Sequence, residues 1–166
     1  MFFQNPSLWK FPMIDSTISI RKAIDADLTA IVAMLADDAL GATREDNSSP
    51  LNRCYTDAFK AIDGDPNQLL VVVEHGGKII GCLQLSFIPG LSRKGMWRGQ
   101  IENVRIASDT RGGGIGRQMI EWAIEQCREH DCGLVQLTTD KSRSDAIRFY
   151  KSLGFVDSHE GMKLSL

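Results

Sequence analysis

A run of three glycines, Gly112 to Gly114, separates a strand-like segment from a long helical pattern. Glycine loses more conformational freedom on folding than any other residue, so such a run is costly unless the backbone needs positive φ angles or a close approach. The first N–H groups of the following helix lack intrahelical partners, and the helix dipole adds roughly half a positive charge there. The junction therefore predicts a phosphate site. The alternative is a tight turn that only ends the strand and starts the helix.

Two familiar phosphate motifs do not fit this loop. Walker A requires a lysine after its last glycine, but Arg117 follows Gly116. The Rossmann fingerprint requires a third glycine where Arg117 stands, and three expected strands precede the loop in direct succession instead of repeated βαβ units. Arg111 and Arg117 flank the loop, and both can add charge-assisted contacts to a phosphate.

The hydrophobic pattern predicts a mixed α/β sheet with helices packed on it. Apolar residues alternate in strand-like segments, as in Ile18 and Ile20, and they recur at helical spacing in Ile115, Met119 and Ala123. Strands are expected at 17–22, 69–74, 79–88, 97–107, 134–138, 155–156 and 162–166, and helices around 28–35, 55–62, 115–130 and 146–153. We expect a single domain over residues 17–166, preceded by an N-terminal extension over residues 1–16.

Two segments resemble motifs of the GNAT superfamily of N-acetyltransferases. Residues 104–116, VRIASDTRGGGIG, resemble motif A, in which Arg or Gln, two residues, Gly, one residue and Gly or Ala form the loop. Residues 146–155, AIRFYKSLGF, resemble motif B, in which an aromatic residue and a tyrosine precede Leu-Gly-Phe. The resemblance extends in element order over roughly 17–156, and it is specific in these two segments.

The resemblance implies a fold, a co-substrate and a binding site. The fold would be a mixed, mostly antiparallel central sheet of about six to seven strands, splayed in the middle and flanked by about four helices. Acetyl-CoA would be the co-substrate, with its pyrophosphate on the loop amides and its pantetheine arm along the preceding strand. The implied cofactor-binding residues are Val104, Ile106, Arg111, Gly112, Gly113, Gly114, Gly116 and Arg117.

The same resemblance implies two catalytic residues, Tyr150 and Glu102. Tyr150 stands at the motif B tyrosine, where a phenol with a pKa near 10 can protonate the departing thiolate. Its alternative role is packing, since it belongs to an apolar stripe. Glu102 would act as a base through water, and its alternatives are an exposed carboxylate or a structural pair with a neighbouring arginine. Water alone can also accept the proton of the amine.

Composition limits the other function classes. The formal net charge of -2 and a pI near 5.9 give no general attraction for nucleic acid or an anionic membrane. No segment approaches the roughly 20 apolar residues that span a bilayer. The cysteines lack zinc-site spacing, so we expect no metal and a reducing, cytoplasmic setting; they are Cys54, Cys82, Cys127 and Cys132.

These observations together predict an N-acetyltransferase that acts on the primary amine of a small molecule by direct attack in a ternary complex. Two alternatives remain open, an acetyltransferase of protein or peptide amines and a non-catalytic, regulatory module that binds coenzyme A. The acceptor pocket is expected from residues 41–52, 89–95 and a C-terminal hairpin. The aromatic residues of the N-terminal extension also make a homodimer an open hypothesis.

Overall fold

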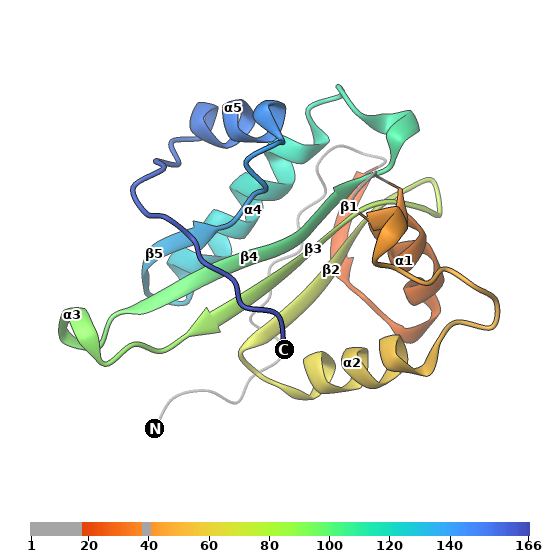
Figure 1. Ribbon diagram of the computed structural model, residues 1–166, viewed down its shortest axis with the longest axis horizontal. Coiled ribbons are helices and arrows are strands. Elements are labelled where there is room, and N and C mark those ends of the chain that lie inside the picture. Colours follow the sequence, from red (N-terminus) through yellow and green to blue (C-terminus); the bar gives the residue numbers. More distant parts are fainter. Residues whose placement is uncertain (1–17, 38–40) are drawn as a thin grey trace.

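Five strands form one sheet whose order follows the chain (Figure 1). The computed structural model describes residues 18–37 and 41–166, so the predicted extension lies outside the described residues. The strands are β1 (Ile18–Lys22), β2 (Gln68–His75), β3 (Lys78–Ile88), β4 (Trp97–Ile106) and β5 (Cys132–Leu137). Neighbouring strands are antiparallel except for β4 and β5, which are parallel.

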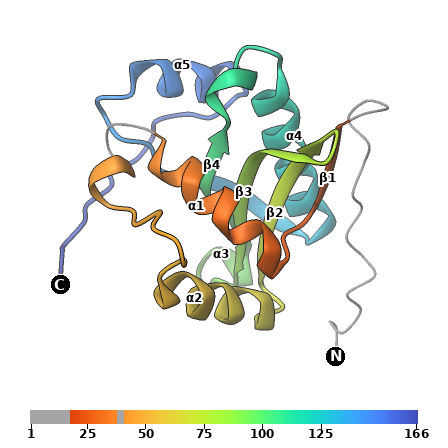
Figure 2. The ribbon, with the colours of Figure 1, turned by 90° about the vertical axis from the view of Figure 1, so that its right-hand side faces the viewer.

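Helices cover both faces of this sheet (Figure 2). The helices are α1 (Leu28–Ala36), α2 (Arg53–Gly64), α3 (Ser92–Gly95), α4 (Ile115–Glu129) and α5 (Ser144–Ser152). The α1 and α2 helices pack on one face and α4 packs on the other, where side chains of α5 join the same apolar cluster. In the described residues no helix is long and apolar enough to cross a membrane.

The four turns of α4 are fixed by one apolar stripe. Ile115, Met119, Ala123 and Cys127 recur at i, i+4 spacing, and all four are buried against the sheet. The contact with β4 is close, because a Cβ atom on Gly99 would lie 2.1 Å from the Sγ of Cys127. Glycine at this position therefore sets how near α4 can approach β4.

The sheet opens halfway along β4. The parallel pairing with β5 runs from Trp97 opposite Cys132 to Ile101 opposite Leu137 and then stops. Beyond Ile101, β4 continues to Ile106 and pairs with β3 alone among the described strands. This opening confirms the splayed sheet that the resemblance implies.

Two expected strands at the C-terminus are wrong. Residues 153–166 form no strand, and the sheet has five strands instead of six to seven. Apolar alternation shows only that a segment is compatible with a strand, whereas a strand also needs a neighbouring edge for its backbone hydrogen bonds. Within the described part of the chain, no edge pairs with this segment.

Candidate active site

The glycine loop joins β4 to α4. Gly112 and Gly114 have φ angles of 90° and 79°, a left-handed conformation that glycine adopts without strain. Gly114 directly precedes the helix, and a Cβ atom on Gly113 would meet only the carbonyl oxygen of Thr110, at 3.8 Å. The run of glycines thus keeps the loop free of side chains while its backbone makes a sharp reversal.

The N-terminus of α4 suits an anion. The helix has 15 residues, its N-cap is Gly114, which has no side chain to cap it, and its first turn contains no acidic residue. Its first N–H groups are therefore not satisfied by the usual caps, and no carboxylate competes for them. A pyrophosphate fits this donor set by charge and by the space that the glycines leave.

Both flanking arginines already have protein partners. The Nε of Arg111 donates to the carbonyl oxygen of Ile106 at 3.1 Å, and its guanidinium lies 3.5 Å from the carboxylate of Asp37. Arg117 donates to Glu121 at 3.3 Å and to the Ser152 hydroxyl at 3.0 Å. Arg111 therefore ties the loop to β4, and Arg117 ties α4 to α5.

Val104 and Ile106 lie on the part of β4 that β5 leaves uncovered. Their carbonyl oxygens accept hydrogen bonds from side chains, Nη1 of Arg105 at 2.9 Å and Nε of Arg111 at 3.1 Å. The next residue, Ala107, bonds instead to Ile80 of β3. Because backbone groups alternate sides along a strand, the two carbonyls face the opening, where an extended amide arm can pair with them.

Tyr150 lies in α5 and is partly buried. Its ring makes edge contacts with Phe149 and Phe155 at centroid distances of 5.2 and 5.9 Å. Burial raises the pKa of the phenol above its usual value, and the positive charges of Arg143 and Arg105 only partly oppose this effect. The hydroxyl therefore stays protonated at neutral pH. Tyr150 is both a packing residue and a possible proton donor.

Phe149 connects α5 to the loop. A Cβ atom on Gly116 would lie 3.6 Å from the Cζ of Phe149, an ordinary contact distance. With the hydrogen bond from Arg117 to Ser152, this contact holds motif B against motif A. The structure therefore brings together the two segments that carry the family resemblance.

Glu102 stands on β4 where the sheet begins to open. It is exposed and lies opposite Gln84 of β3. Among the described residues Glu102 forms no ion pair. The alternative role, a structural ion pair with a neighbouring arginine, is therefore absent from the described residues. The next residue, Asn103, has a φ of 53° beside an irregularity in the β3–β4 register, which redirects β4 at this point.

The sequence interpretation missed a row of polar side chains beside Glu102. The hydroxyl of Ser86 and the amide of Gln84 donate to Gln68 at 2.6 and 3.2 Å, and the amide of Asn103 donates to Gln84 at 3.0 Å. Gln84 shares the face of Glu102, opposite the α4 cluster. The usable signal was the alternation of polar residues within a buried apolar strand, since this pattern marks polar groups directed at one face.

The predicted acceptor loop over 41–52 is tied to α2. The hydroxyl of Tyr55 donates to Glu45 at 2.9 Å and accepts from the backbone N–H of Asp46 at 2.8 Å. The side chain of Asn52 caps α2 by accepting from the N–H of Cys54. The carboxylate of Glu45 therefore holds the loop in place.

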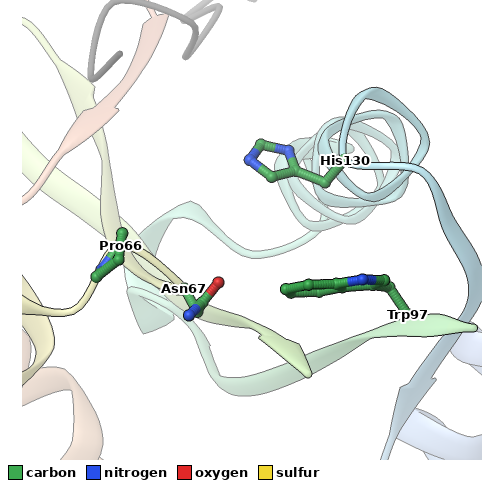
Figure 3. Close-up of a pocket in the computed structure, with 4 residues that line it drawn as sticks. All are labelled: Pro66, Asn67, Trp97 and His130. Carbon is green, nitrogen blue, oxygen red and sulfur yellow. The ribbon is translucent and has the colours of Figure 1, made fainter. Parts of the chain in front are cut away.

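A pocket at the other end of α4 is distinct from the predicted site (Figure 3). It is lined by Pro66, Asn67, Trp97 and His130, and the His130 ring stacks on Phe87 with 4.0 Å between centroids. Because α4 has 15 residues, the pocket lies about 22 Å along the helix from the glycine loop. None of the predicted cofactor-binding or catalytic residues lines it.

Comparison with known families agrees with this geometry. The model of the acetyltransferase (GNAT) family matches residues 34–155, which include the glycine loop, Glu102 and Tyr150. The chain belongs to the GNAT family. As a GNAT protein it is an acyltransferase of a family that uses acetyl-CoA, and in the described residues no group of three or more His, Cys, Asp or Glu could hold a metal ion.

Individual relatives support the GNAT assignment. Aminoalkylphosphonate N-acetyltransferase of Salmonella typhimurium is 32% identical over 107 residues, which cover 64% of this chain and 69% of the relative. An L-methionine sulfoximine/L-methionine sulfone acetyltransferase of Pseudomonas paraeruginosa is 28% identical over 141 residues, or 82% and 79% of the two chains. A solved structure from Bacillus halodurans C-125, described as a transcriptional regulator, has a TM-score of 0.88 at 50% identity and covers 90% of this chain and 99% of that one.

Proposed function

We propose that this GNAT protein transfers the acetyl group of acetyl-CoA to the primary amine of a small molecule, by direct attack within a ternary complex. The observation that carries the proposal is the convergence of the open edge of β4, the glycine loop and the Tyr150 helix at one place. The two enzymes named above are called acetyltransferases of small amine compounds, which supports the same class of acceptor here.

Different groups of the chain would bind different parts of acetyl-CoA and of the acceptor. The backbone N–H groups around Gly112 to Gly116 would hold the pyrophosphate, with Arg111 and Arg117 able to turn toward it. The backbone of Val104 and Ile106 would hold the pantetheine arm along β4. When bound, acetyl-CoA supplies the activated acetyl thioester. The polar row of Gln68, Gln84, Ser86 and Asn103 would line the acceptor side beside Glu102.

Proton transfer would involve Glu102 and Tyr150. The amine must lose a proton as its nitrogen gains the acetyl group, and the exposed Glu102 carboxylate can accept that proton through a water molecule. The thiolate that departs needs a proton, which the protonated Tyr150 hydroxyl can supply. Four free cysteines, two of them buried, support the further proposal of a reducing, cytoplasmic location.

The test is thiol release from acetyl-CoA against a panel of aminoalkylphosphonates, amino acids, polyamines and lysine peptides. We expect turnover with a small amine and little with peptides. Turnover with peptides alone would refute the acceptor class. If coenzyme A raises the unfolding temperature of the protein but no amine is acetylated, a regulatory module that binds coenzyme A is favoured. The solved structure from Bacillus halodurans, described as a transcriptional regulator, supports this second candidate. If neither turnover nor a thermal shift is observed, the glycine loop is only a turn.

A further inference from the structure

Arg105 lies on β4, in the part of the strand that β5 leaves uncovered. It pairs with Cys82 of β3, and Glu102 pairs with Gln84 of the same strand. Cys82 and Gln84 are two residues apart, so their side chains lie on one face of the sheet. Because directly paired residues of neighbouring strands share a face, Arg105 and Glu102 lie on that face together.

A β-bulge is responsible for this placement. In a regular strand, residues three apart point to opposite faces. Asn103 has a φ of 53° beside the irregularity in the β3–β4 register, and one additional residue in β4 returns Arg105 to the face of Glu102. The two residues are separated by about 10 Å along the strand. The bulge therefore brings a cation and the proposed base to the same side of the sheet opening.

The face that carries Arg105 is the side on which the proposed function places the acceptor. Cys82 belongs to the apolar cluster beneath α1 and α2, and the loop over 41–52 connects these two helices in the chain. The glycine loop instead precedes α4, which packs on the other face. A ligand group that meets Arg105 is therefore a group of the acceptor and not the pyrophosphate of coenzyme A.

The Arg105 guanidinium also lies close to the proposed proton donor. Burial raises the pKa of the Tyr150 phenol, and the positive charges of Arg143 and Arg105 oppose part of this rise, so both guanidiniums act on the hydroxyl. Nη1 of Arg105 donates to the carbonyl oxygen of Val104 at 2.9 Å, on the strand that would hold the pantetheine arm. Arg105 is half-buried, and a charge acts more strongly where water is partly excluded.

We propose that Arg105 selects the acceptor by binding an anionic group, so that the preferred substrate is a compact primary amine that also carries a carboxylate or a phosphonate. This inference rests on the proposed acetyltransferase function and adds a substrate class to it. The planar guanidinium has five N–H donors, and its fork matches two oxygens of such a group. The amine would lie near Glu102 and the anion at Arg105. A polyamine would instead place a second positive charge beside Arg105, where like charges repel.

Calorimetric titration in the presence of coenzyme A tests this inference without requiring turnover. The probes are matched pairs, an amino acid with its carboxamide and an aminoalkylphosphonate with the amino alcohol of equal chain length. We expect the natural chain to bind the anionic member of each pair about tenfold or more tightly than the neutral member. Arg105→Gln should weaken binding of the anionic member by about 10- to 100-fold and leave the neutral member nearly unchanged, because it removes a charge-assisted hydrogen bond. The matched control, Arg98→Gln, removes the same charge near the start of the same strand and should change neither.

Three results would overturn the selection: no preference of the natural chain for the anionic member, an equal loss for both members in Arg105→Gln, or the same loss in Arg98→Gln. If thermal unfolding shows that Arg105→Gln does not fold, Arg105→Lys keeps the charge without the planar fork and should show an intermediate loss for the anionic member alone. Thiol release separates the two proposals. Charge-dependent binding without turnover supports this inference and refutes the acetyltransferase, whereas turnover of both members with equal kcat/KM does the reverse.

Discussion

Replacing Gly99 by alanine tests whether the close approach of α4 to β4 holds the fold together. The added Cβ atom would lie 2.1 Å from Sγ and 3.3 Å from Cβ of Cys127, and 3.8 Å from Leu85. Cys127 is fully buried on the central stripe of α4, so its sulfur has little room to move aside. Overpacking of this kind costs about 1–3 kcal/mol, and the first contact places Gly99→Ala at the upper end of that range.

The same distances predict a rescue. Cys127→Ala removes the sulfur and alone should destabilise the protein by about 1 kcal/mol through the cavity it leaves. In the double variant the new methyl group fills that space, and the 3.3 Å contact to the Cβ of residue 127 is the only tight contact of the added Cβ atom that remains. The double variant should therefore be more stable than Gly99→Ala alone, with a coupling of about 1–2 kcal/mol.

Urea denaturation of the four proteins measures this coupling directly. Thermal unfolding should show Gly99→Ala lower by about 4–10 °C, from the usual shift per kcal/mol at this chain length. The control Gly64→Ala, in α2, adds a Cβ atom with no neighbour within 4 Å and should not lower stability. If Gly99→Ala and its double variant with Cys127→Ala unfold at the same urea concentration, the steric argument is wrong.

Three further predictions concern the site and its support. Tyr150→Phe should lower turnover by about a hundredfold while the coenzyme A dissociation constant stays near that of the natural chain, and equal turnover would exclude the acid role. Gly114→Val should weaken coenzyme A binding in a calorimetric titration by about tenfold or more; Gly95→Val, at a matching φ of 78°, carries the same strain at the other end of β4, and equal binding by the two would refute the loop site. The Asp27 carboxylate is buried, and this burial acts to raise its pKa. Hydrogen bonds from Arg21 and from the Ile24 N–H nevertheless hold the pKa below its usual value. Asp27→Asn should therefore lower the free energy of unfolding by about 1.5–3 kcal/mol at neutral pH. Because the folded pKa is the lower one, this contribution is complete above the unfolded-state value and is lost as pH falls below about 4, so urea midpoints of the two proteins should converge there.

Most helices and strands could be predicted, because the apolar spacing and the turn residues that define them lie within or next to each segment. The expected strand over 79–88 and helix over 115–130 differ from β3 and α4 by one residue at a boundary, since a hairpin turn and a glycine run mark those ends. The conformation of the glycine loop could also be predicted, because Gly112 and Gly114 adopt the positive φ angles that the glycine run indicates, whereas phosphate binding by this loop stays a prediction.

Features that depend on distant neighbours could not be predicted in the same way. The C-terminal residues 162–166 have a strand pattern, but pairing requires an edge that the pattern does not specify. The position of Arg105 near Tyr150 depends on how α5 packs over the end of β4, which no spacing within either segment encodes. The hydrogen bonds from Gln84 and Ser86 to Gln68 likewise depend on strand register.

The arginine hydrogen bonds on β4 have a consequence for ligand exchange. Arg105 and Arg111 donate to the two carbonyls that an amide arm would need, so binding replaces one set of hydrogen bonds with another and changes their number little. The hydrogen bonds along β4 should then contribute little to the enthalpy of ligand binding, since each new hydrogen bond to a carbonyl displaces one from an arginine. If the proposed binding mode is correct, the displaced Arg111 guanidinium would be released beside the glycine loop, where the pyrophosphate would lie. Pairing along the strand and charge neutralisation at the helix would then be coupled through a single side chain.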